Sequence, residues 1–197
     1  MDLDLYITLM NEVKKRTNAI TGILKKTNTT TYQATNIEFM CLQLRKILEL
    51  ISLGSLVANK KEFECQQIKY QQFWHAKRII KDIEKLNPDF YPKPIIELPS
   101  KNQGIKNDLV DMKDGYLTKE EFVNFYDQLG KIMHADNPFG TKTDLAYYES
   151  QIEDCYKKVI KLLNCHMIRL KGKEEFYLIH MQEERDDLVH GYIFGKV

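Results

Sequence analysis

The segment from Ile37 to Ala58 constrains the fold more than any other part of the chain. Its sequence, IEFMCLQLRKILELISLGSLVA, is apolar on nearly every side, whereas a surface helix is apolar along one stripe only. A helix of this composition is stable only when other elements surround it. The sequence therefore predicts a buried central helix that begins after Asn36, a residue type that favours helix N-caps.

Two further helices are expected in the first half of the chain. Residues 3–26 have apolar side chains at helical spacing and end in a cluster of Asn and Thr. Residues 60–86 have a stripe of isoleucines that stops before Asn87-Pro88. Residues 87–107 hold four of the five prolines, so they are expected to form an extended connecting loop.

The next segment is expected to contain a hairpin and two helices. A tight hairpin is predicted near 108–118, because Asp114-Gly115 separates two short alternating runs. Thr118 and Glu121 form a capping box that opens a helix expected to end at His134. A last helix, capped by Thr143, is expected to reach Leu163.

The pattern changes at Cys165, where three β-rich runs are separated by KGKE and EERDD. They predict a three-stranded antiparallel meander in residues 165–197. The fold class is therefore α+β and mainly α: a bundle of about five helices, a short hairpin near 108–118 and the meander. We expect a single domain over residues 1–197, helical in 1–163 with the sheet appended.

Composition limits the classes of function. The chain has 29 basic and 28 acidic side chains and a formal charge of +1, which argues against a general polyanion binder. The four cysteines form no C-x-x-C pair, as expected of reduced thiols. Acids at positions 2 and 4 argue against a signal peptide, and charges interrupt the longest apolar run. These features predict a cytoplasmic protein without a membrane span.

One hypothesis for a functional site centres on His134. This residue follows Tyr126 and Gly130 at i, i+4, i+8 spacing, near a predicted helix end whose dipole stabilises a protonated imidazole. Gly130 leaves room for a ligand, and Asn137 adds an amide beyond the helix. In the alternative interpretation, His134 caps its own helix and Gly130 lets another helix approach closely.

Arg45 is a charged residue within the most apolar helix. It lies on a narrow polar stripe with Glu49, and an i, i+4 pair between the two gives Arg45 a purely structural role. Otherwise its guanidinium is available to a phosphate or carboxylate held against His134. Both interpretations remain open from the sequence.

A basic stripe is predicted on the helix at 60–86, where an aromatic residue lies beside a ladder of cations. Such a stripe can follow a phosphate backbone and predicts binding of RNA or a nucleotide through a local patch. The alternative is an ordinary solvated face, since Asp82 and Glu84 dilute the charge. The candidate ligand-binding residues on this stripe are Trp74, Lys77, Arg78 and Lys81.

Other chemistry is not expected. DMKDGYLTKEEF resembles an EF-hand loop, but Val110 and Met112 occupy the first two ligand positions and offer calcium no side-chain oxygen. The chain lacks a G-x-S-x-G elbow and a phosphate-binding glycine loop. The spacings of the sheet histidines and Cys165 match no compact metal motif, so no metal or cofactor is expected; these histidines are His166, His180 and His190.

The apolar helix containing LRKILEL, with a later helix ending in YDQLGKIMHADNP, resembles the HEPN superfamily of small bacterial helical domains over residues 36–163. Many HEPN proteins are ribonucleases or toxin-like defence proteins that use an Arg-x4-6-His motif without metal, often as dimers. The formal match here is RDDLVH. The resemblance implies that Arg185 stabilises phosphate charge and that His190 is the acid or base. The family motif lies on a helix, whereas Arg185 falls in a predicted turn and His190 in a predicted strand.

Three functions follow as hypotheses. The first is a cytoplasmic HEPN-like module that binds a nucleotide, a nucleic acid or a protein partner. The second is a metal-independent ribonuclease of the toxin or defence type, which uses Arg185 with His190 or Arg45 brought to His134 by folding. The third is a structural subunit of a homo-oligomer, such as a homodimer, whose sheet edge pairs with another protomer.

Overall fold

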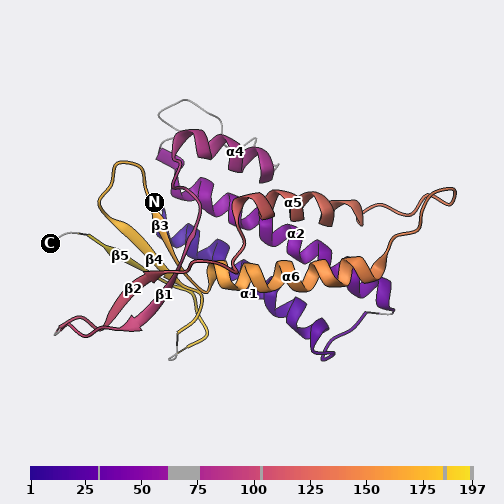
Figure 1. Cartoon of the computed structure of the whole chain (residues 1–197), viewed down its shortest axis with the longest axis horizontal. Coiled ribbons are helices and arrows are strands. Elements are labelled where there is room, and N and C mark those ends of the chain that lie inside the picture. The colour runs from indigo at the N-terminus through magenta and orange to yellow at the C-terminus, as the bar shows by residue number, and fades with distance from the viewer. Residues whose placement is uncertain (31, 62–75, 103, 184–185, 196–197) are drawn as a thin grey trace.

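A computed structural model shows an α+β protein in which a helical bundle has a β-sheet at one end (Figure 1). It describes the whole chain except residues 31, 62–75, 103, 184–185 and 196–197. The described residues form five helices and one five-stranded antiparallel sheet. The α+β class is therefore confirmed. None of the described helices is both long and apolar enough to span a bilayer.

Helix α2 (Gln33–Ala58) is the central helix, as the apolar segment predicts. It contacts helices α1, α4, α5 and α6, and its inward side chains are almost fully buried. The predicted N-cap is wrong, because the helix begins three residues before Asn36, after the N-cap Tyr32. The Asn36 side chain instead accepts a hydrogen bond from the backbone N–H of Thr30 at 2.8 Å. Asn36 therefore closes the preceding turn.

The remaining helices pack around α2. Their bounds are α1 (Leu3–Leu24), α4 (Ala76–Leu86), α5 (Lys119–Lys131) and α6 (Leu145–Leu163). Helices α1 and α6 occupy the predicted segments. Helix α4 forms the last part of the predicted helix at 60–86, and residues 62–75 of that helix lie outside the described residues.

Two predicted helix ends are wrong. Helix α5 has the predicted capping box of Thr118 and Glu121, but it ends at Lys131. The N–H of His134 donates to the carbonyl of Lys131 at 3.4 Å, so this histidine lies in the turn after the helix. Helix α6 is capped by Asp144, whose carboxylate accepts the N–H of Tyr147, whereas Thr143 donates its hydroxyl to Asp136.

The sheet is larger than the predicted meander. Strands β3 (Cys165–Arg169), β4 (Phe176–His180) and β5 (His190–Phe194) form the meander itself. Strands β1 (Lys93–Pro99) and β2 (Asn107–Asp111) add to its β3 edge and give the order β2-β1-β3-β4-β5. The prediction of three strands and of a helical region that reaches residue 163 is corrected accordingly.

Prolines explain why β1 was predicted as a loop. Pro94 and Pro99 lie near the two ends of the strand, where a missing N–H costs least. The predicted hairpin at 108–118 is also wrong, because β2 pairs with β1 across residues 100–106. Gly115 makes a turn with a φ of +78°, but the N–H of Leu117 then donates to the carbonyl of Lys158 on α6. This segment therefore continues along α6 instead of folding back on β2.

The two faces of the sheet have different surroundings. His166 of β3 faces the helices and bonds Tyr6 of α1, and Gly191 of β5 lies directly beneath Leu3 of α1. Side chains alternate between faces along a strand, so Cys165 and Met167 point the other way. On that second face a small apolar cluster forms around Ile95, Met167 and Leu178.

Candidate functional site

The structure brings together three of the predicted site residues between α2 and α5. The guanidinium of Arg45 donates from Nη1 to the carbonyl oxygen of Tyr126 at 2.9 Å, and its carbon lies 3.9 Å from the centre of the Tyr126 ring. A Cβ added at Gly130 would overlap Nη1 of Arg45. The space left by the missing side chain of Gly130 is thus occupied by Arg45.

Glu49 completes this interhelical cluster. Its carboxylate lies 3.7 Å from Nε of Arg45 and accepts a hydrogen bond from the hydroxyl of Tyr126 at 3.2 Å. Burial is the largest cause of the raised pKa of Tyr126, and the neighbouring Arg45 opposes it. The guanidinium therefore has partners on both helices, an arrangement that holds α2 and α5 together.

His134 and Asn137 lie away from this cluster. His134 is exposed beside a cavity of about 420 Å³ whose wall includes Phe39 and Leu42 of α2. Asn137 accepts the N–H of Phe139 at 3.0 Å and so forms a turn in the α5–α6 loop, which projects from the end of the bundle opposite the sheet (Figure 1). Within the described ranges, no hydrogen bond or ion pair joins Arg45 to His134.

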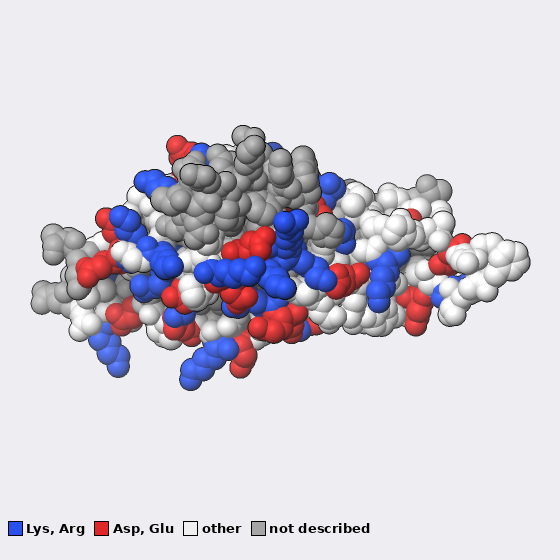
Figure 2. All heavy atoms as spheres, turned by 90° about the horizontal axis from the view of Figure 1, so that it is seen from above, with Lys and Arg blue, Asp and Glu red and all other residues white. Residues whose placement is uncertain are grey.

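The predicted basic stripe on α4 is partly neutralised by acids. Lys77 lies 2.5 Å from a carboxylate oxygen of Asp127, and Arg78 lies 3.6 Å from one of Asp82. Lys81 is exposed, and Trp74 lies outside the described residues. Figure 2 shows blue and red side chains interspersed over the face seen from above. Among the residues of this face that the structure describes, the charges are mixed and form no continuous basic track.

Of the two functional residues in the RDDLVH match, the structure describes only the histidine. Arg185 lies outside the described residues. His190 opens β5, and its Nε2 lies 2.7 Å from a carboxylate oxygen of Asp186. The histidine is therefore in a strand, as predicted from the sequence, and not on a helix as in the HEPN motif.

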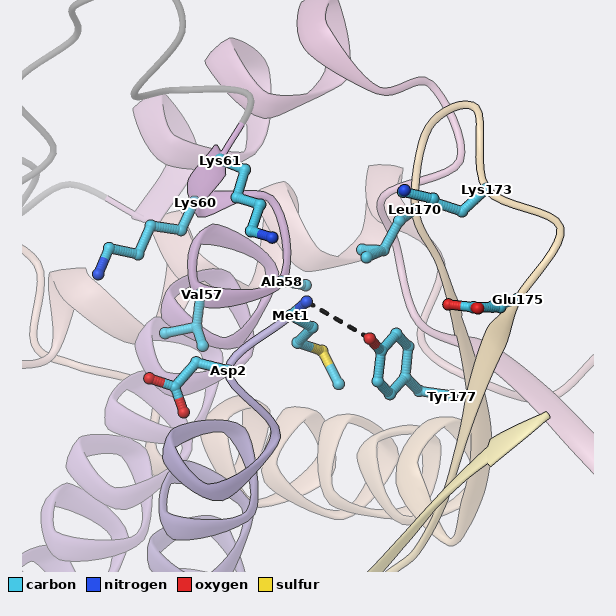
Figure 3. A pocket seen from close by; sticks show the side chains of 10 residues that line it. All are labelled: Met1, Asp2, Val57, Ala58, Lys60, Lys61, Leu170, Lys173, Glu175 and Tyr177. Carbon is cyan, nitrogen blue, oxygen red and sulfur yellow. Dashed lines mark hydrogen bonds between the residues drawn. The ribbon is translucent and has the colours of Figure 1, made fainter. Parts of the chain in front are cut away.

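A cavity that the sequence did not predict lies where α1, α2 and the β3–β4 turn meet (Figure 3). Its volume is about 390 Å³. Tyr177 of β4 forms part of its wall, and the nitrogen of Met1 donates to the Tyr177 hydroxyl at 3.4 Å. The other residues that line it are Asp2, Val57, Ala58, Lys60, Lys61, Leu170, Lys173 and Glu175.

The charged side chains of this cavity differ in direction. Figure 3 shows the ammonium groups of Lys61 and Lys173 turned into the cavity from opposite sides, whereas Lys60 points away. The Glu175 carboxylate enters from the β3–β4 turn, so the two lysine ammonium groups share the cavity with this carboxylate and with the nitrogen of Met1. Val57 and the other apolar side chains supply a hydrophobic wall. The cavity can therefore hold an anionic group against an apolar surface.

The sequence contains both halves of this site but no sign that they meet. Lys61 follows the end of the central helix, and Lys173 lies in the hairpin turn KGKE. Each lysine alone is an ordinary surface residue. Their meeting depends on where the β3–β4 hairpin lies against the C-terminal end of α2, a long-range contact without a local pattern.

Comparison with known proteins gives no relative for this chain. No protein-family model matches it, and neither does any curated protein or solved structure. The resemblance to the HEPN superfamily therefore stays a prediction.

Proposed function

We propose that the protein is a binding module for a small phosphorylated ligand of the nucleotide class. The observation that carries this proposal is that Lys61 and Lys173 reach into one cavity from two separate elements (Figure 3). An ammonium group is a strong donor to phosphate oxygens, and such charge-assisted bonds are about twice as strong as neutral ones. Because a phosphate has several acceptor oxygens, both ammonium groups are available to one phosphorylated ligand.

The rest of the cavity suits the organic part of such a ligand. Its volume of about 390 Å³ falls within the range of small-molecule sites. Val57, Ala58 and Leu170 form an apolar wall, and the hydroxyl of Tyr177 offers a polar contact. Glu175 faces the lysines and disfavours an additional negative charge beside it, which favours a ligand that binds by one end.

A small ligand fits the described surface better than a nucleic acid does. The chain has a formal charge of only +1, and the lysines of α4 are mixed with acids. A phosphate backbone requires a line of cations, whereas a single phosphate requires one cluster. The ribonuclease hypothesis requires an arginine and a histidine in one cleft, and no observation on the described residues favours it.

The proposal is tested by isothermal titration of the purified chain with a panel of nucleoside mono-, di- and triphosphates, with inorganic phosphate and with the unphosphorylated nucleosides. We expect saturable binding of a phosphorylated compound and none of its nucleoside. Lys61→Met and Lys173→Met each weaken binding by about tenfold or more, because each removes a charge-assisted hydrogen bond.

The matched control is Lys106→Met, which removes the same charge from an exposed position between β1 and β2, outside the cavity. This variant keeps the wild-type affinity. The proposal is overturned if no phosphorylated compound binds, or if Lys61→Met and Lys173→Met bind as tightly as Lys106→Met does.

A further inference from the structure

Three strands bring a carboxylate, a thiol and an imidazole together on the face of the sheet away from the helices. Glu97 lies on β1, Cys165 begins β3 and His180 ends β4. One ligand atom from each residue lies within 4.8 Å of the other two. Carboxylate oxygen, thiolate sulfur and imidazole nitrogen are the three donors that zinc accepts in proteins.

The strand register produces this convergence. Cys165 is the direct partner of His180 in the β3–β4 ladder, so their side chains lie on the same face. Strand β1 pairs with β3 only at Lys93 and Pro94. Glu97 lies beyond this short ladder, and its side chain still approaches His180, with Oε2 3.2 Å from Nε2.

The two nitrogens of His180 have different surroundings. Nε2 is buried, faces Glu97 and makes no hydrogen bond to any described residue. Nδ1 lies 3.5 Å from a carboxylate oxygen of Glu183, and this carboxylate also accepts the hydroxyl of Tyr192. A metal-binding histidine characteristically directs one nitrogen to the metal and its other N–H to a carboxylate. In His180, Nε2 faces Glu97 and Nδ1 lies beside the Glu183 carboxylate, so each nitrogen is placed for one of these two roles.

We propose that Glu97, Cys165 and His180 form a binding site for a divalent cation of borderline softness, such as Zn²⁺, with water at the fourth position. A thiolate and a carboxylate together balance the charge of such a cation. Ca²⁺ and Mg²⁺ prefer sites made of oxygen ligands, so the sulfur of Cys165 selects against both. This site is separate from the lysine-lined cavity and does not depend on the function proposed above.

A nucleophilic thiol is the competing interpretation of the same residues. Burial, and then the charge of Glu97, raises the pKa of the Cys165 thiol to about 12. The thiolate is the reactive form, and this surrounding suppresses it. A cation between the same groups reverses the effect, since it stabilises both the thiolate and the carboxylate.

A bound cation also has a structural consequence. Strands β1 and β2 form a hairpin that pairs with β3 through only two residues of β1 and extends beyond them. The ligands come from β1, β3 and β4, so one cation connects this hairpin to the β3–β4 hairpin. Cation binding is therefore expected to protect the β1–β2 hairpin from proteolysis.

The test is a titration of the metal-free full-length chain with Co²⁺, followed by absorption spectroscopy, and with Zn²⁺ in competition. We expect one cation per chain and a thiolate-to-Co²⁺ charge-transfer band that Zn²⁺ removes. Cys165→Ser abolishes the band, and His180→Gln and Glu97→Gln weaken the affinity by at least about 100-fold. Glu183→Gln, which removes the carboxylate beside Nδ1 of His180 and leaves the three proposed ligands in place, weakens it by about 10- to 100-fold.

The matched control is His190→Gln, because His190 is the register partner of His180 on the next strand and bonds Asp186 instead. This variant keeps the band and the affinity. Circular dichroism of each variant verifies that it is folded. The proposal is overturned if the wild type binds no Co²⁺, if folded Cys165→Ser retains the band, or if His190→Gln loses affinity as His180→Gln does.

Discussion

The buried histidine between the sheet and α1 predicts a specific dependence of stability on pH. His166 is fully buried, with Nδ1 2.8 Å from the carbonyl oxygen of Leu163 and Nε2 2.9 Å from the hydroxyl of Tyr6. A carbonyl only accepts, so Nδ1 carries the proton and Nε2 accepts from Tyr6. The neutral imidazole satisfies both bonds, whereas a second proton on Nε2 forces the tyrosine to give up its role as donor.

The sign and size of the effect follow from the pKa of His166. Burial lowers it from 6.5 to about 4, while the unfolded chain keeps the ordinary value. The unfolded state therefore binds a proton that the folded state refuses, and stability falls as the pH decreases from 6.5 towards 4. At about 1.4 kcal/mol per pKa unit, the full loss is about 3 kcal/mol. Of this, about 2 kcal/mol is lost between about pH 7.5 and about pH 5.

The assay is urea unfolding followed by circular dichroism across this pH range, for the wild type and His166→Gln. The variant is less stable at neutral pH by about 1–2 kcal/mol, because it lacks the bond to Leu163. Its stability nevertheless falls by about 2 kcal/mol less than that of the wild type on acidification. All other titrating groups are common to both proteins and cancel in the difference.

The control is His134→Gln, which makes the same substitution at an exposed position and leaves both hydrogen bonds of His166 in place. Parallel profiles for the wild type and His166→Gln between about pH 7.5 and about pH 5 would refute the reasoning, because the histidine then titrates equally in both states.

Two further variants test the contacts that hold the helices. Gly130→Ala displaces the Arg45 guanidinium from the Tyr126 carbonyl. The free energy of unfolding falls by about 1 kcal/mol once the gain in helix propensity is set against the lost contact. In an Arg45→Met background, Gly130→Ala is expected to stabilise the protein by up to about 1 kcal/mol, because no guanidinium is displaced. Chemical denaturation of the four proteins of this double-mutant cycle measures the effect, and a Gly130→Ala substitution that destabilises both backgrounds contradicts this account. Asn87→Ala removes a buried amide that bonds Asn59 at 2.8 Å and the carbonyl of Arg169 at 3.2 Å. It lowers the free energy of unfolding by about 2–3 kcal/mol, whereas a comparable loss in the exposed control Asn102→Ala would contradict this attribution to burial.

Local patterns predicted the elements whose cause is local. The capping box of Thr118 and Glu121 starts α5 at the predicted residue, because both partners lie within one helical turn. The apolar segment at 37–58 became the central helix for a similar reason, since its composition requires burial on every side. In contrast, β1 was missed because its prolines signal a loop, and only pairing with β2 and β3 makes it a strand.

The candidate sites also combine local contacts that the sequence predicts with long-range contacts that it does not. Arg45 and Glu49 are one helical turn apart, so their pairing is visible in the sequence, but the approach of Tyr126 and Gly130 to them depends on how α5 packs. Counting outward by equal steps from the turn KGKE pairs Cys165 with His180, so the sequence contains a signal that these two residues lie opposite each other. Glu97 had no comparable signal, because its strand was not predicted.

The β3–β4 hairpin connects the two proposed sites. Its turn supplies Lys173 and Glu175 to the lysine-lined cavity, and its open end supplies Cys165 and His180 to the cation site. The ladder between these ends has five residue pairs and is about 14 Å long at the usual rise per residue of a strand. No side chain belongs to both sites, so the two ligands do not compete for a residue. A cation at the open end fixes the hairpin against β1 and thereby restrains the strands that direct Lys173 into the cavity. Because ordering by the first ligand reduces the entropy that the second must lose, binding at the two sites is expected to be mutually favourable.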